Sequence, residues 1–339
     1  MRAWVGLVGL VLVASACSTT DATSATAPGS GPGSRAAVSS STLEVGGRAW
    51  VSVSVATLWR SPTSPRPVDA PALRHPDEIG RWLAGMSLAQ RRDLNGRADT
   101  QALLGDRVVV LALPSSRPAW ARVAVPSQPS PLNAKGYPGW VPRRQLTATA
   151  PTASSQVATV LRRTTWLLTD ASTPSRLFPI SVGTTLPVVS TTTTYVRVLA
   201  PGGSVRRLLR KAVVVHSTGT PALAPTRSSI VARAESFVGL AYLWAGASGF
   251  GVDCSGLTWL TYRLHGVRIP RDAAPQSRRG TPASPARRGD LLFYSTGGVV
   301  HHVSMYVGND RMVHSPATGQ VVSIVTLQTP NAGSRRYLP

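Results

Sequence analysis

Short apolar segments, each closed by a turn residue, make up most of the middle of the chain. In AWVSVSVATLWRSP, apolar and polar residues alternate over residues 50–58, and the run stops at Pro62. Alternation with a period of two, interrupted by proline and glycine, is typical of small β-domains that carry binding residues on their loops. The 28 prolines and 30 glycines also indicate many turns. We therefore predict two successive β-domains, at residues 46–148 and 149–218.

Helical periodicity is confined to a few segments. One helical insertion is predicted in the first β-domain, at residues 77–92. The segment SSIVARAESFVGLAY combines serine N-cap candidates with apolar residues at helical spacing and predicts another helix. A third is predicted to begin at Cys254 and to end before Gly266, because leucines recur there at helical spacing. GDLLFYS and HHVSMYVGNDRMVHSP predict three strands, so the domain at residues 226–339 is α+β.

The N-terminus predicts export. MRAWVGLVGLVLVASAC has one early arginine, an apolar stretch too short to span a membrane, and small residues directly before Cys17. Its end resembles the lipobox of bacterial lipoproteins, in which the cysteine carries the lipid, although Ala14 replaces the usual leucine. We expect residues 1–17 to be a lipoprotein signal peptide and Cys17 to anchor the protein to the membrane outside the cytoplasm, in the cell envelope; a plain secretory signal is the alternative. Residues 18–45, rich in serine, threonine, glycine and proline, predict a flexible linker.

The charge balance favours anionic partners. The formal net charge is +22, from 36 basic and 14 acidic residues, and nearly all the basic residues are arginines. These arginines are scattered, and the chain has no zinc-finger spacing, basic-region helix or basic–aromatic RNA signature. A generally basic surface is therefore the main interpretation. Export argues against nucleic acid as a partner, whereas anionic lipid or wall polymers remain candidates.

Cys254 is the only cysteine besides Cys17. If Cys17 is lipidated or removed, the Cys254 thiol has no partner, and a free thiol in an exported protein favours a reactive role. A cysteine in the first turn of a helix is expected to have a lowered pKa, because the helix dipole stabilises the thiolate. Such a nucleophile still requires a base.

Two histidines are candidates for that base and its partner. In HHVSMYV, His302 alternates with apolar residues and points away from the core, whereas His301 falls on the apolar face and is the poorer candidate. His314 follows twelve residues after His302. An odd-numbered hairpin loop, such as residues 308–310, would put both rings on one face, and a two-residue loop would separate them. Surface histidines without a catalytic role are the alternative.

Three segments together resemble the NlpC/P60 family of cell-wall cysteine peptidases: YLWAGASGFGVDCSGLTWLTYRLHGVRIPRDAAPQ, RRGDLLFYS and HHVSMYVGNDRMVHSP. The resemblance implies a papain-like fold, with the cysteine helix packed on an antiparallel sheet. It implies hydrolysis of amide bonds in peptidoglycan stem peptides, without a metal or another cofactor. By position, Cys254 is the nucleophile, His302 the general base, His314 the orienting residue, and Tyr242 a border of the site. The backbone amide of Cys254 is a candidate oxyanion donor.

Three further residues near the nucleophile follow from this resemblance. Asp253 and Ser255 flank the cysteine and are candidates for substrate contact, with a turn and a helix start as their alternative roles. Ala245 stands where the family usually has a second adjacent glycine, so its methyl group is expected near the wall of the cleft.

The first β-domain has a resemblance of its own. DTQALLGDRVVV, WARVAVPSQ and GYPGWVPRRQL resemble the bacterial SH3 domain of γ-D-glutamyl-L-diamino-acid endopeptidases, also called the dipeptidyl-peptidase VI type. These enzymes carry two SH3-like domains before the catalytic domain. They cut stems between D-Glu and the diamino acid when the N-terminal L-Ala is free. The expected substrate is therefore L-Ala-γ-D-Glu-meso-diaminopimelate.

The same resemblance assigns Asp106, Tyr137 and Asp272 to the ammonium group of this substrate, which carboxylates and acceptor oxygens would stabilise. Asp106 replaces the usual glutamate, and Ala273 replaces the usual serine. A turn residue and a core aromatic are the alternative roles of Asp106 and Tyr137.

A second hypothesis uses the same domains without the chemistry. The SH3-like domains would attach a non-catalytic or weakly active lipoprotein to peptidoglycan, and the catalytic fold would serve as a scaffold. The presence of Cys254, His302 and His314 together favours the enzyme. We expect a monomer in either case.

Overall fold

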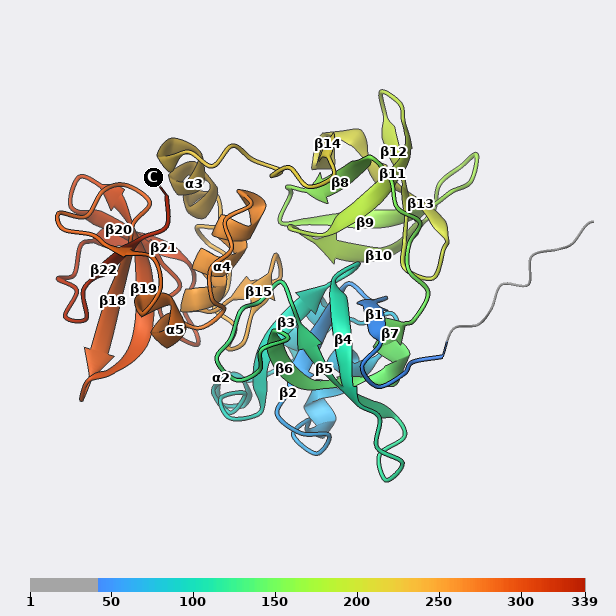
Figure 1. Cartoon of the computed structure of the whole chain (residues 1–339), viewed down its shortest axis with the longest axis horizontal. Coiled ribbons are helices and arrows are strands. Elements are labelled where there is room, and N and C mark those ends of the chain that lie inside the picture. Colours follow the sequence, from blue (N-terminus) through green and yellow to red (C-terminus); the bar gives the residue numbers. More distant parts are fainter. Residues whose placement is uncertain (1–41, 339) are drawn as a thin grey trace, which may run out of the picture. The chain divides into compact units, whose positions relative to one another are not determined.

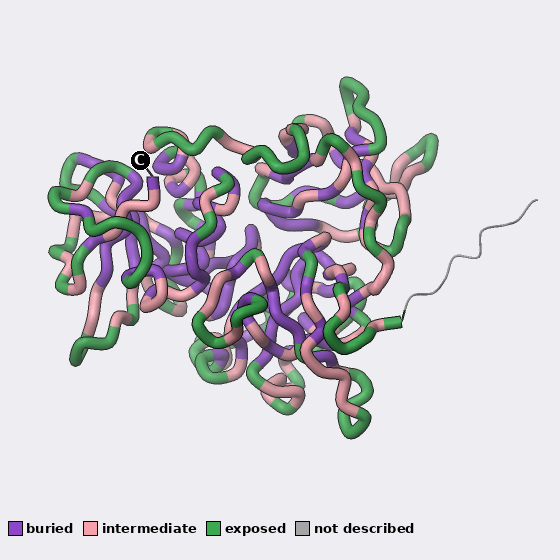
Figure 2. Tube along the Cα trace, in the orientation of Figure 1, coloured by how far each residue is buried: buried purple, intermediate pink, exposed green. Residues whose placement is uncertain are grey.

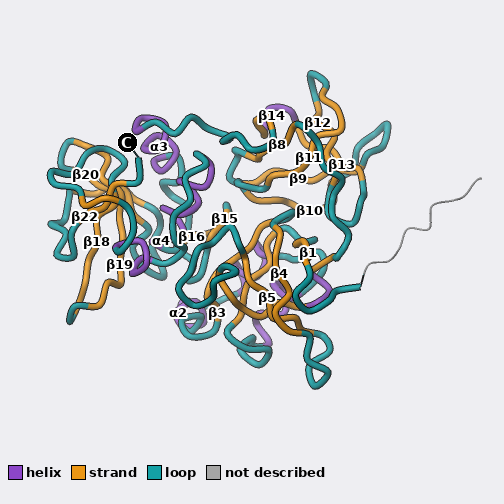
Figure 3. Tube along the Cα trace, in the orientation of Figure 1, coloured by secondary structure: helices purple, strands orange, loops and turns teal. Residues whose placement is uncertain are grey.

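The protein structure is a computed structural model that describes residues 42–338. The predicted signal peptide, the lipidation site Cys17 and nearly all of the linker therefore lie outside the described residues. The described elements follow one another from blue to red in Figure 1, and Figure 3 shows strands as the main regular structure before helix α3. No helix within the described part of the chain is long and apolar enough to cross a membrane.

A seven-stranded antiparallel sheet, ordered β3-β2-β6-β5-β4-β1-β7, forms the first β-domain. Its strands are β1 (Arg48–Val51), β2 (Val55–Trp59), β3 (Ala98–Leu103), β4 (Arg107–Ala112), β5 (Trp120–Val125), β6 (Tyr137–Pro142) and β7 (Leu146–Thr147). The alternating run at residues 50–58 is thus two strands rather than one. β1 pairs with β4 and β7, whereas β2 pairs with β3 and β6, so the chain changes its place in the sheet between them.

The helical insertion predicted at residues 77–92 is divided. It contains α1 (Ile79–Gly85) and α2 (Leu88–Arg92), and a 3-10 helix, η1 (Pro67–Leu73), precedes them; a second short 3-10 helix, η2 (Arg143–Gln145), leads into β7. The break has a local cause, because Met86 is extended and Ser87 begins a new helix. The Ser87 hydroxyl accepts a hydrogen bond from the Gln90 amide at 3.2 Å.

A second seven-stranded sheet, ordered β10-β9-β13-β12-β11-β8-β14, follows. Its elements are β8 (Gln156–Val160), β9 (Thr164–Thr169), β10 (Arg176–Ser181), β11 (Thr185–Thr191), β12 (Tyr195–Leu199), β13 (Val205–Leu209), the 3-10 helix η3 (Arg210–Ala212) and β14 (Val213–Ser217). Alternate residues of its strands form a separate apolar core, which includes Val160, Leu167 and Val196.

The C-terminal domain combines helices with a six-stranded sheet, ordered β17-β22-β18-β19-β20-β21. Its elements are α3 (Arg227–Glu235), β15 (Ala247–Ser248), β16 (Gly251–Val252), α4 (Cys254–Leu264), α5 (Ala273–Ser277), β17 (Thr281–Pro282), β18 (Leu291–Thr296), β19 (Val299–Gly308), β20 (Arg311–His314), β21 (Ser323–Thr326) and β22 (Ser334–Arg336). α4 and α5 both pack against β19. As predicted, the cysteine begins a helix that ends before Gly266, whose φ of +70° suits glycine.

The core of the C-terminal domain continues into the first β-domain. Val55, Trp59 and Leu103 belong to the same buried apolar cluster as Leu260 and Phe293. In Figure 2, buried segments run along the strands of the first sheet and along α4. The β-domain and the cysteine helix therefore share one hydrophobic core.

Two bulges in β19 determine where its histidines point. The β19–β20 loop has two residues, Asn309 and Asp310, both with left-handed φ, instead of the predicted three. A register shift between Tyr306 and Gly308 adds one residue to β19, so His302 and His314 still share a face. A second shift, opposite Tyr294 and Ser295, leaves His301 outside the pairing. His301 is therefore exposed rather than on the apolar face, which corrects the sequence-based expectation.

Candidate active site

Cys254 occupies the first position of α4 and is 9% exposed. Asp253 caps the helix, since its Oδ1 accepts the Gly256 amide at 2.6 Å. The sulfur accepts from the backbone amides of Val303 and Ser255, which places β19 beside the thiol. Burial raises the pKa of Cys254 to about 12, and this effect outweighs both amides and the nearby Arg271. The lowered pKa expected from the helix start is therefore wrong for this closed site, where the resting thiol is protonated.

His302 directly precedes Val303, whose amide contacts the thiol, and its ring is oriented by His314. The His302 Nε2 lies 3.1 Å from the His314 Nδ1, and the rings meet edge to face, 5.3 Å apart. Burial lowers the pKa of His302 to about 4, with a further contribution from His314, so the ring is neutral at neutral pH. When the His302 Nε2–H donates to His314, the His302 Nδ1 is left as the proton acceptor. The pair can then deprotonate a buried thiol.

A buried arginine ties the start of α4 to the first β-domain. The Arg271 guanidinium donates to both Asp253 carboxylate oxygens, at 3.0 and 2.8 Å, and to the Ser255 hydroxyl at 3.0 Å. It also donates to the Gly246 carbonyl oxygen at 3.2 Å and, through Nε, to the Thr100 hydroxyl of β3 at 2.9 Å. Asp253 and Ser255 thus have helix-capping and ion-pair roles in this structure. The sequence analysis missed Arg271, although it directly precedes the predicted Asp272.

Two hydrogen bonds extend this junction along β3. The Trp244 indole N–H donates to the Ala98 carbonyl oxygen at 2.9 Å, and the Ala247 amide donates to the Gln101 side chain at 3.1 Å. Between them, Ala245 has a φ of +65° and is buried. Glycine is favoured at positions with a left-handed backbone conformation. The Cβ of Ala245, which stands where the family usually has glycine, therefore carries a steric cost.

Tyr137 and Asp272, predicted to hold the substrate ammonium, do meet. The Tyr137 hydroxyl donates to the Asp272 carboxylate at 3.0 Å, across the junction between β6 and the start of α5. Burial raises the pKa of Asp272, and the charge of Asp99 on β3 raises it further. Asp99 also raises the pKa of Tyr137. These three residues form the acidic cluster.

Asp106 does not belong to the acidic cluster. Both of its carboxylate oxygens bind the guanidinium of Arg263, in the last turn of α4, and one also accepts the Leu103 amide at 2.9 Å. The Asp106 amide in turn donates to the Leu103 carbonyl oxygen at 2.8 Å, so Asp106 is the turn residue of the alternative interpretation. Within the first β-domain, the acid near Tyr137 is instead Asp99, the first residue of the DTQALLGD motif.

Tyr242 lies beside the nucleophile, as its motif position implies. It forms an isolated parallel bridge with Val252 and is 7% exposed. Burial raises the pKa of Tyr242, and the charges of Asp253 and Cys254 raise it further, which places its ring near both residues. The structure thus brings a thiol, an oriented imidazole and a tyrosine to one place.

Comparison with known proteins identifies two matching domain models and several similar proteins. The NlpC/P60 family model matches residues 239–337, and the model described as the YKFC SH3b2 domain matches residues 160–216. A gamma-D-glutamyl-L-lysine dipeptidyl-peptidase of Bacillus cereus is 38% identical over 86% of this chain and 91% of its own length. A Bacillus subtilis protein of the same name is 36% identical over 80% and 91%. A solved NlpC/P60 family protein from Bacillus cereus aligns with a TM-score of 0.80 and 36% identity, over 86% of this chain and 100% of that one.

Proposed function

The chain belongs to the NlpC/P60 family of cysteine peptidases, and from this premise we propose that it hydrolyses the γ-D-glutamyl–L-diamino-acid amide of peptidoglycan stem peptides. The observation that carries the proposal is the buried Cys254 thiol against β19, with His302 oriented by His314 at 3.1 Å. The similar Bacillus proteins are named for a γ-D-glutamyl-L-lysine bond. The sequence predicts meso-diaminopimelate as the diamino acid, so both substrates belong in the test.

The neutral pair suits a mechanism in which proton transfer accompanies attack. The Cys254 sulfur forms a bond to the γ-carbonyl carbon of D-Glu while the His302 Nδ1 takes the thiol proton. Negative charge develops on the carbonyl oxygen, near the positive end of α4 and the Cys254 amide. The His302 imidazolium then protonates the departing amine of the diamino acid. A water molecule, deprotonated by His302, hydrolyses the thioester and releases the thiol.

The acidic cluster supports a requirement for a free N-terminal L-Ala. Asp272 and Asp99 offer carboxylate oxygens to a terminal ammonium group, and the Tyr137 hydroxyl adds a further oxygen; one Asp99 oxygen also accepts from the exposed Arg60 at 2.8 Å. An N-acylated stem, as in intact peptidoglycan, would lose this charge and leave the Asp272 carboxylate without a cation from the substrate.

Incubation of the purified protein with free L-Ala-γ-D-Glu-L-Lys and L-Ala-γ-D-Glu-meso-diaminopimelate tests the proposed activity. We expect release of L-Ala-γ-D-Glu from at least one of them and none by Cys254→Ala. Cleavage of neither peptide, combined with retention of the protein on peptidoglycan, would favour the binding hypothesis instead.

We also propose that the protein is exported and lipid-anchored through Cys17, on the basis of its N-terminal sequence. Labelling of cells with radioactive palmitate should mark the wild-type protein and not Cys17→Ser. Equal labelling of both would contradict the anchor.

A further inference from the structure

A second strongly charged feature lies away from the catalytic residues. A cavity of about 650 Å³ opens between the β8–β9 connection, the 3-10 helix η3 and the end of α3, and we call it the cationic cleft. Four of its lining residues carry positive charge: Arg162, Arg163, Lys211 and Arg233. No aspartate or glutamate lines it within the described chain.

Arg233, on α3, is incompletely paired. Its Nη2 donates to the Leu161 carbonyl oxygen at 2.6 Å, and its guanidinium stacks over the Phe237 ring at 4.9 Å. Its Nε is buried and has no hydrogen-bond partner among residues 42–338. A buried N–H without an acceptor costs about 1–3 kcal/mol, so the surrounding protein does not fully compensate this side chain.

Arg163 lies next to this guanidinium, but its partners are uncharged. It donates to the Ser236 carbonyl oxygen at 2.9 Å and to the Val238 carbonyl oxygen at 2.6 Å, which joins the second β-domain to α3. Burial lowers the pKa of Arg233 to about 10, and the charge of Arg163 contributes to that shift. The Arg233 guanidinium therefore remains charged at neutral pH, and no carboxylate among the lining residues separates it from Arg163.

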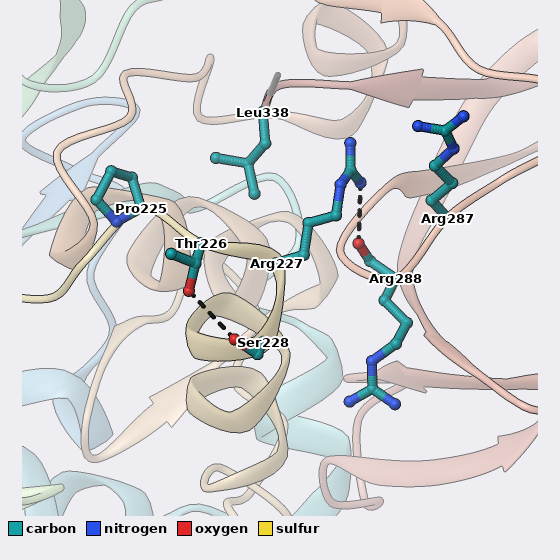
Figure 4. Close-up of a pocket in the computed structure, with 7 residues that line it drawn as sticks. All are labelled: Pro225, Thr226, Arg227, Ser228, Arg287, Arg288 and Leu338. Carbon is teal, nitrogen blue, oxygen red and sulfur yellow. Dashed lines mark hydrogen bonds between the residues drawn. The ribbon is translucent and has the colours of Figure 1, made fainter.

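The pocket at the other end of α3 provides a contrast. Figure 4 shows Arg227, Arg287 and Arg288 around the start of the helix, with Arg227 donating to the Arg288 carbonyl oxygen. Asp290 does not line this pocket, but its carboxylate accepts from Arg227 at 3.1 Å and from Arg336 at 2.8 Å, so part of the charge is compensated within the protein. In the cationic cleft, by contrast, the hydrogen-bond acceptors of Arg163 and Arg233 are backbone carbonyl oxygens.

We propose that the cationic cleft is a binding site for a phosphate group. A phosphate oxyanion offers several acceptors at once, which matches the fork of donors on neighbouring arginines, and it stays ionised at neutral pH. Its oxygens can accept from the exposed side chains of Arg162, Arg163 and Lys211 that line the cleft, and its charge can offset the repulsion between Arg233 and Arg163. Bound there, it would join the second β-domain to α3. Free phosphate, glycerol-phosphate polymers and phospholipid headgroups share this chemistry.

Titration of the full chain with inorganic phosphate, at constant ionic strength set with sodium chloride, tests the site. We expect a saturable rise in the midpoint of thermal unfolding, since a ligand that binds only the folded state stabilises it by mass action. Arg163→Gln should weaken phosphate binding about tenfold, the effect of losing one charged hydrogen-bond partner. Arg233→Gln should weaken phosphate binding as well. If that variant fails to fold, Lys211→Gln, which changes an exposed residue of the same cleft, replaces it and should also weaken phosphate binding.

Arg288→Gln is the matched control, because it removes the same charge from a second arginine-lined pocket, whose Arg227 is paired with Asp290. It should leave the phosphate titration unchanged, and Arg163→Gln should cleave the tripeptide at the wild-type rate. The proposal is overturned if phosphate has no saturable effect, or if Arg163→Gln and Arg288→Gln weaken it equally. Failure of the peptidase assay would not affect this outcome.

Two further arms identify the source of the phosphate. Soluble poly(glycerol phosphate) that binds more tightly than inorganic phosphate, and loses this advantage in Arg163→Gln, would indicate a wall polymer. The same result with phosphatidylglycerol vesicles, and not with phosphatidylcholine vesicles, would indicate a lipid headgroup. Absence of a gain in both arms would assign the site to free phosphate.

Discussion

The two β-domains contact the catalytic domain in different ways. The first does so with an ion pair and with buried side chains, among them the Thr100 hydroxyl that accepts from Arg271 beside the nucleophile. The second reaches α3 through Arg163, whose acceptors are backbone carbonyl oxygens, and it also makes a buried hydrogen bond from the Gly249 amide to the Ser181 hydroxyl at 2.8 Å. None of the ion pairs within residues 42–338 joins this second domain to the catalytic one. We infer that the first domain supports catalysis directly, whereas the second retains charge for another ligand.

The largest effect is expected inside the catalytic domain, where neither β-domain can compensate. His302→Ala removes the assigned base, which precedes the residue whose amide contacts the thiol, and kcat should fall about a thousandfold or more. Stopped assays with the free tripeptide would measure this loss. Folding should be retained, so a variant with unchanged unfolding midpoint and unchanged kcat would contradict the assigned base.

Arg271→Met tests the junction with the first β-domain. It leaves the Asp253 carboxylate buried without its partner, which should lower the free energy of unfolding by about 3–5 kcal/mol. Urea unfolding would measure the change. Arg163→Gln is the comparison at the second junction and should cost about 1 kcal/mol, because it removes hydrogen bonds to neutral carbonyl groups. Similar losses in the two variants would remove the distinction between the domains.

The pH profile of kcat/KM depends on burial of His302 at the junction of α4 and β19. Because its pKa is lowered to about 4, the neutral base persists as the pH falls from 7 to 5. For an imidazole with the ordinary pKa of about 6.5, only about one thirtieth would be neutral at pH 5. The free energy of unfolding changes in the same direction as activity. As the pH falls, the histidine of the unfolded chain binds a proton before the buried His302 of the folded protein does, so the contribution of His302 to stability is lost between about pH 6.5 and pH 4. An activity midpoint near 6.5 would contradict a buried, neutral His302.

Thr100→Val is the smallest change and isolates the contact from the first β-domain. It removes the acceptor of the Arg271 Nε and the donor to Gln128, and should cost about 1–2 kcal/mol of stability. The kcat should fall with KM nearly unchanged, because the contact positions the start of α4 and does not touch substrate. Thr100→Ser keeps the hydroxyl and should restore both values. Equal behaviour of the valine and serine variants would argue against this contact.

The sequence predicts those parts of the site that depend on local pattern. Cys254 at a helix start and His302 on a strand follow from spacing within single elements. Their relation to His314 depended on an odd loop, and the structure reaches the same result with a two-residue loop and a bulge. A bulge of this kind leaves no clear signal in one sequence, since it reflects pairing with other strands.

Contacts between distant segments could not be predicted in this way. Arg271 meets Thr100 from 171 positions away, and no periodicity connects them. Asp106 and Asp99 lie in the same motif, so sequence alone could not decide which one faces Tyr137. In the structure, Asp106 lies in the turn after β3 and its carboxylate binds Arg263. Asp99, near the start of β3, is the one whose charge acts on Tyr137. The predicted lowering of the Cys254 pKa differs from the structure for a related reason. Burial of the thiol, which raises that pKa, depends on the whole fold and not on the helix start alone.

The most direct test of the claim that the first β-domain forms part of the active site compares two substrates. The ratio of kcat/KM for L-Ala-γ-D-Glu-L-Lys to that for its N-acetylated form should be about a hundredfold or more in the wild type, as expected for a lost charged contact at a buried acid. Asp99→Asn should reduce this ratio about tenfold, because its ion pair with the half-exposed Arg60 is weak and leaves the carboxylate able to meet the ammonium group. Asp106→Asn, in the same domain but held by both oxygens to the more buried Arg263, should leave the ratio unchanged. Equal cleavage of both peptides by the wild type, or equal changes in the two variants, would contradict the account.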